Sequence, residues 1–91
     1  MSISPEIKAL ADEFNVDANA LQGMTDWILR RLSGNDPKFL EAFTENPDEF
    51  MNVAVKKYCE MYTKWCDEVL NSPEKMDELC NQIYEDLNKG K

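Results

Sequence analysis

The chain has 91 residues, of which 43% are hydrophobic and 31% charged, so we expect one globular domain over residues 1–91 and no wholesale disorder. Eighteen acidic against ten basic residues give a net charge of −8, which disfavours a protein whose main task is to bind phosphates. Because histidine is absent, the commonest general base and metal ligand is missing, and we expect neither an enzyme nor a bound cofactor.

Helix starts are marked by all four prolines, because each follows a residue that caps helices: Ser4-Pro5, Asp36-Pro37, Asn46-Pro47 and Ser72-Pro73. Asp17 offers a fifth start, and Gly34 and Gly90 are placed to end helices. No stretch alternates with period two, so no strand is expected. The sequence predicts an all-α fold, a single-domain bundle of four to five helices at 5–14, 18–32, 37–44, 47–70 and 73–88.

The first two predicted helices carry an apolar pattern over residues 7–26: Leu10, Ala11, Phe14, Val16, Leu21 and Met24. In its spacing this segment resembles a helix-turn-helix motif. Ala11 falls at the crowded helix crossing, and Asn15 takes the turn position usually given to glycine. Asparagine suits that position because it tolerates a left-handed backbone.

A DNA-binding role for residues 7–32 would place the second helix in the major groove, with these residues facing outward: Asp17, Ala18, Asn19, Gln22, Gly23 and Asp26. Asn19 and Gln22 would read adenine edges, and no lysine or arginine lies on this face before Arg30 and Arg31. The two aspartates on this face would repel the DNA backbone. We therefore expect the motif to serve packing, and keep DNA binding as the alternative.

The segment 36–49 holds five acidic residues against one basic residue, Lys38. Aromatic side chains lie beside the acids, an arrangement typical of docking sites for a partner with a basic surface. Solubility and the helix dipole also explain acids at such positions. The candidate protein-binding residues are Phe39, Glu41, Phe43, Glu45, Asp48 and Glu49.

The predicted helix 47–70 has two apolar rows, which indicates a central helix with neighbours on two sides. The second row would instead be exposed in a self-associating structural subunit such as a homodimer. This row comprises Met51, Val55, Cys59, Tyr62, Cys66 and Leu70.

The three cysteines, Cys59, Cys66 and Cys80, match no zinc-ligand spacing and are expected to be reduced thiols. Cys66 and Cys80 would come together only if their helices pair antiparallel. With no apolar run long enough for a membrane span or a signal peptide, we expect a cytoplasmic protein. The leading hypothesis is a small acidic protein-binding module, an adaptor, inhibitor or assembly factor without catalysis.

Overall fold

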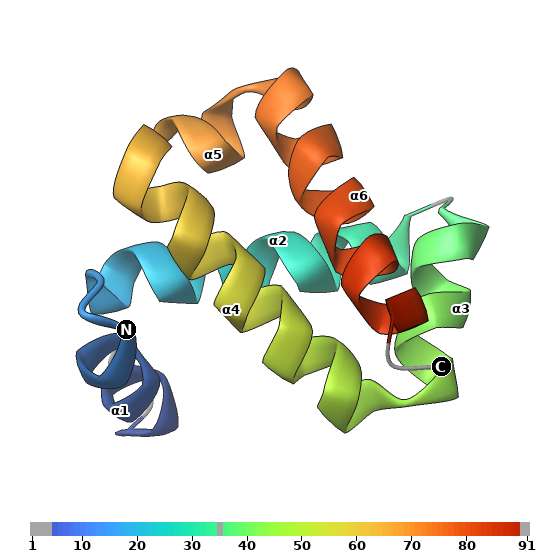
Figure 1. The fold of residues 1–91 in the computed structure, drawn as a ribbon, viewed down its shortest axis with the longest axis horizontal. Coiled ribbons are helices and arrows are strands. Elements are labelled where there is room, and N and C mark those ends of the chain that lie inside the picture. Colours follow the sequence, from blue (N-terminus) through green and yellow to red (C-terminus); the bar gives the residue numbers. More distant parts are fainter. Residues whose placement is uncertain (1–4, 35, 90–91) are drawn as a thin grey trace.

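Six helices form the fold of the residues that the computed structural model describes, 5–34 and 36–89 (Figure 1). They are α1 (Pro5–Phe14), α2 (Ala18–Ser33), α3 (Pro37–Glu45), α4 (Pro47–Trp65), α5 (Glu68–Asn71) and α6 (Pro73–Lys89). The described residues contain no strand, and the predicted all-α class is confirmed. Within the same residues, no helix is both long and apolar enough to cross a membrane.

Side-chain caps explain where the helices begin. The Asp36 carboxylate accepts a hydrogen bond from the Phe39 N–H (3.2 Å), and the Asn46 side chain accepts one from the Glu49 N–H (3.2 Å). Each cap is followed by proline at the start of α3 or α4, as predicted. The predicted cap at Ser4 and the stop at Gly90 lie outside the described residues.

The turn between α1 and α2 has the left-handed residue predicted from the sequence. Asn15 has φ 58°, its N–H donates to the Asp12 carbonyl (3.3 Å), and the Val16 N–H donates to the Ala11 carbonyl (2.9 Å). This pair of hydrogen bonds is a Schellman motif, which satisfies the last carbonyls of α1. Ala11 is buried at the crossing, also as predicted.

The predicted single helix over 47–70 is wrong in its extent. α4 ends at Trp65, Cys66 adopts φ 50° and ψ −130°, and α5 follows after Asp67. These dihedrals are those of the first central residue of a type II′ turn, a position that favours glycine. The break redirects α5 so that Val69 is fully buried and Leu70 lies against Gly23 of α2. Tertiary packing has overridden the helical periodicity of the sequence.

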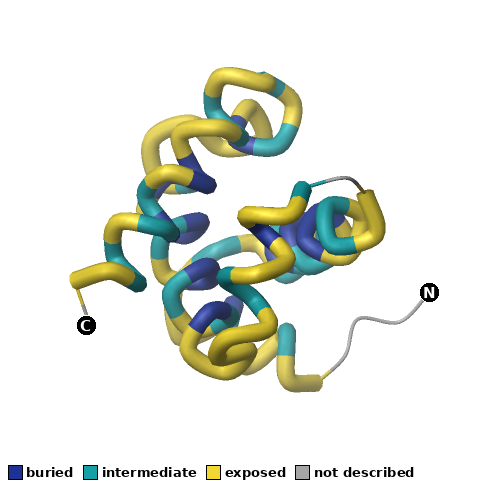
Figure 2. The backbone as a smooth tube through the Cα atoms, turned by 90° about the vertical axis from the view of Figure 1, so that its right-hand side faces the viewer, coloured by how far each residue is buried: buried dark blue, intermediate teal, exposed yellow. Residues whose placement is uncertain are grey.

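α4 occupies the centre of the fold, in contact with α2, α3, α5 and above all α6 (Figure 1). Its central position was predicted from its two apolar rows. The buried residues lie on the inward sides of the helices (Figure 2). Of the residues in the second predicted row, Val55 and Cys59 are buried and only Cys66, beyond the end of α4, is exposed, so this row does not form the continuous exposed surface that self-association through it requires.

An aromatic cluster joins α2, α3 and α4. The Phe39 ring meets the rings of Trp27 (5.7 Å) and Phe50 (5.1 Å) edge to face, and the Phe43 ring meets that of Phe50 (5.5 Å). The guanidinium of Arg31 covers both Trp27 and Phe39. Phe39 is therefore the centre of a packed cluster at the α2–α3–α4 junction.

Candidate functional site

A groove opens where α3 and the first turn of α4 meet the last turns of α6, three segments that lie together in Figure 1. Its volume is about 420 Å³. We call it the acidic groove, and its lining residues are Lys38, Glu41, Ala42, Glu45, Asn46, Glu49, Tyr84, Leu87 and Asn88.

Helix geometry and a cap position the three carboxylates. Glu41 and Glu45 are four residues apart on α3, so they share one face of that helix. Glu49 belongs to a reciprocal capping arrangement, in which the Asn46 Nδ2 donates to the Glu49 Oε2 (3.3 Å) while the Asn46 Oδ1 accepts from the Glu49 N–H. The local sequence at the α3–α4 junction therefore fixes the acidic side of the groove.

The groove has an excess of negative charge. Of its lining residues, three are acidic and only Lys38 is basic. Within residues 5–34 and 36–89, no ion pair joins Glu41 or Glu49 to a lysine or arginine. The Lys38 Nζ lies over the Tyr84 ring, 4.5 Å from its centroid. Partial burial raises the pKa of the Tyr84 hydroxyl to about 12, so this ring stays neutral at physiological pH.

The structure brings together half of the residues predicted for protein binding: Glu41, Glu45 and Glu49. Asp48 is exposed but does not line the groove. The prediction of Phe39 as a docking anchor is corrected, because its side chain is 0% exposed and packed in the aromatic cluster. Phe43 is half-buried against Phe50 and also lies outside the groove.

Sequence reasoning missed the wall of the groove that α6 contributes. Tyr84 and Leu87 lie on α6 and are partly buried against the core. Their approach to α3 depends on how α6 folds back along α4. No local pattern in 73–88 signals that approach.

The residues expected to contact DNA differ in how far the structure exposes them. Asn19 is exposed, but Gln22 is half-buried and donates to the Asp26 carboxylate (3.3 Å). Gly23, expected to face outward, instead lies against α5, with Leu70 3.7 Å from the position of a Cβ.

The two arginines of this segment differ in accessibility. Arg30 is exposed. Arg31 is engaged within the fold: its Nε donates to Asp36 (3.1 Å), and its guanidinium lies 5.5 Å from the Trp27 ring centroid. The expectation that both arginines reach phosphates is corrected for Arg31, which holds the α2–α3 junction together.

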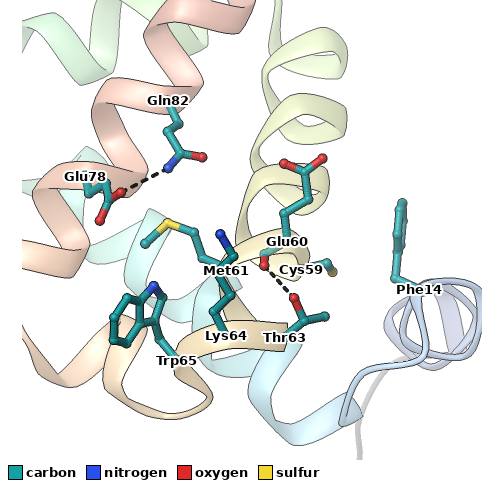
Figure 3. A pocket seen from close by; sticks show the side chains of 9 residues that line it. All are labelled: Phe14, Cys59, Glu60, Met61, Thr63, Lys64, Trp65, Glu78 and Gln82. Carbon is teal, nitrogen blue, oxygen red and sulfur yellow. Dashed lines mark hydrogen bonds between the residues drawn. The ribbon is translucent and has the colours of Figure 1, made fainter.

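A second hollow, of about 510 Å³, lies over the C-terminal half of α4 between the end of α1 and α6 (Figure 3). Two bonds are formed within its lining: Gln82 Nε2 donates to Glu78 Oε1 (3.4 Å), and the Thr63 hydroxyl donates to the Glu60 carbonyl (2.7 Å). Phe14 stands apart from the others in Figure 3. Its lining has two acidic residues, Glu60 and Glu78, and one basic residue, Lys64, so its excess of negative charge is smaller than that of the acidic groove.

The three cysteines are free thiols, two of them buried. Burial raises the pKa of Cys59 to about 11 and that of Cys80 to about 11, which makes both weak nucleophiles. Cys66 is exposed at the break after α4. In the part of the chain that the structure describes, no three Cys, Asp or Glu side chains are grouped to hold a metal ion.

No known protein family, curated protein or solved structure matches this chain. Its class is therefore defined by its own features, a small all-α protein with a central helix and an acidic groove.

Proposed function

We propose that this protein acts by binding a basic segment of another protein in the acidic groove, without catalysis of its own. The observation that carries the proposal is the convergence of Glu41, Glu45 and Glu49, from two helices, on one hollow. Complementary charge gives such an interface its specificity and speeds encounter with the partner. A hollow of this volume is within the range of roughly 300–1,000 Å³ that is usual for ligand pockets.

An adaptor, inhibitor or assembly factor would use the groove in the same way, by holding a partner rather than changing it. The free thiols of Cys59, Cys66 and Cys80 support a reducing compartment such as the cytoplasm. The net charge of −8 also attracts a basic segment non-specifically, so the test has to distinguish this attraction from binding in the groove.

The test compares two triple variants with the same net charge. One carries Glu41→Gln, Glu45→Gln and Glu49→Gln, which neutralise the groove. The other carries Glu6→Gln, Asp12→Asn and Glu13→Gln, all exposed on α1. Binding of a fluorescent oligolysine peptide is followed by anisotropy at low and high salt.

The proposal predicts that the groove variant loses at least about tenfold in affinity, since each close charge pair at an interface contributes on the order of 1 kcal/mol or more. The α1 variant should lose much less. Equal losses in the two variants would show that the peptide senses net charge only, and would overturn the proposal.

The alternative function is sequence-specific DNA binding through residues 7–32. The left-handed turn at Asn15 supports it, because the resemblance to a helix-turn-helix motif places such a residue there. It predicts that Asn19→Ala and Gln22→Ala abolish sequence preference, and that Arg30→Gln lowers the salt dependence of binding. The absence of measurable affinity for random-sequence duplex DNA at low salt would exclude this alternative.

A further inference from the structure

The acidic groove already contains one cation on an aromatic ring. Lys38 of α3 extends across to α6, where its Nζ lies 4.5 Å from the centroid of the Tyr84 ring. Cations within about 6 Å of a ring centroid are attracted to the negative face of the ring. Lys38 is exposed and Tyr84 half-buried, so the ring is held by the fold while the lysine is in contact with solvent.

The carboxylates of the groove alone would attract any cation, whereas the Tyr84 ring favours a cation that can lie on an aromatic face. Two apolar residues, Ala42 and Leu87, also line the groove. A lysine or arginine side chain has a long apolar stem and a charged head, and it buries the stem on apolar surface while the head stays polar. An aromatic face, an apolar wall and carboxylate acceptors together match such a side chain.

We propose that the groove recognises a single lysine or arginine side chain of its partner, which displaces Lys38 from the face of Tyr84. This inference rests on the proposed function and names the chemical group that the groove reads. Lys38 then acts as an internal competitor: it occupies the ring when no partner is bound, and it must leave before the partner's cation can enter.

The first experiment removes the competitor. Lys38→Met keeps most of the side-chain length but not the charge, and Lys56→Met is the matched control, because Lys56 is exposed on α4 and does not line the groove. Both variants have the same net charge. We expect the Lys38 variant to bind the oligolysine peptide about two- to fivefold more tightly than the Lys56 variant does, the range of one exposed cation–π contact.

The second experiment removes the ring face. Tyr84→Leu, made in the Lys38→Met background, should lose that gain, whereas Tyr84→Phe in the same background should keep it because the ring remains. A thermal melt of each variant shows whether it is folded at the titration temperature. A peptide with acetylated lysines should not bind any of them.

The outcomes separate the two proposals. If the groove triple variant loses binding but Tyr84→Leu binds as tightly as Tyr84→Phe, the groove binds basic segments without using the ring, and this inference is wrong. Equal affinities of the Lys38→Met and Lys56→Met variants would also overturn it. If the groove triple variant and the α1 triple variant lose equally, the proposed function itself fails.

Discussion

Replacing Phe39 tests whether this aromatic side chain belongs to the core or to a docking surface. Its ring is fully buried and meets two other rings edge to face. Truncation of a buried phenylalanine to alanine costs about 3–5 kcal/mol, through lost burial and the cavity left behind. The neighbouring Leu40 is 45% exposed, so Leu40→Ala should change the free energy of unfolding by less than about 0.5 kcal/mol.

The stability lost by Phe39→Ala is a large fraction of the total free energy of unfolding. A domain of this size has a free energy of unfolding of about 5–15 kcal/mol, and each kcal/mol lowers the melting temperature by about 4–8 °C. Phe39→Ala should therefore melt at least about 12 °C below the unmodified protein, or not fold at all. Phe39→Leu, which leaves a smaller cavity, provides a variant that still folds.

Urea unfolding followed by circular dichroism measures both substitutions. The urea concentration at the midpoint of unfolding should be highest for Leu40→Ala, lower for Phe39→Leu and lowest for Phe39→Ala. If the free energy of unfolding of Phe39→Ala were within about 1 kcal/mol of that of the unmodified protein, the packing described for the α2–α3–α4 junction would be refuted. Phe39 would then again be a candidate surface anchor.

Three further predictions concern the cysteines. Cys66→Gly should raise the free energy of unfolding by about 1 kcal/mol, because glycine relieves about 1–3 kcal/mol of backbone strain at φ 50° while its greater loss of backbone entropy on folding costs about 0.5–1 kcal/mol. Cys66→Ser should give no such gain in the same urea titration. Iodoacetamide at pH 8 should modify Cys66 rapidly and Cys59 and Cys80 only upon unfolding; mass spectrometry showing uniform labelling of the folded protein would contradict the burial of the two thiols. Stability should fall as pH rises from about 9 to about 11, because the thiols of Cys59 and Cys80 lose their protons at a lower pH in the unfolded state than in the folded one; a melting temperature that rises over this interval would contradict the raised pKa of the two buried thiols.

Local signals in the sequence were sufficient to predict most helix boundaries. The caps at Asp36 and Asn46 and the left-handed turn at Asn15 each depend on one or two neighbouring residues, and the structure has all three. The break at Cys66 was missed because it runs against local preference. α5 packs against α6 and α2 with Val69 fully buried, and this packing cannot be seen in the periodicity of residues 47–70.

The candidate site was predictable only in part, for the same reason. The acids at 41, 45 and 49 stood out by composition and by helical spacing. Their neighbours Tyr84 and Leu87 belong to a helix that reaches α3 only after the chain has folded back along α4. Phe39 was misassigned because an aromatic residue beside acidic ones has the same sequence pattern whether it faces solvent or the core.

A ¹H–¹⁵N NMR titration of the protein with the oligolysine peptide shows directly where on the fold the peptide binds. If the peptide binds in the acidic groove, the largest changes in backbone chemical shift should fall on two segments, 38–49 and 84–88, and should saturate together. Shifts spread evenly over the acidic positions of α1, α5 and α6, or centred on 60–65 beside the second hollow, would contradict the acidic groove as the binding site.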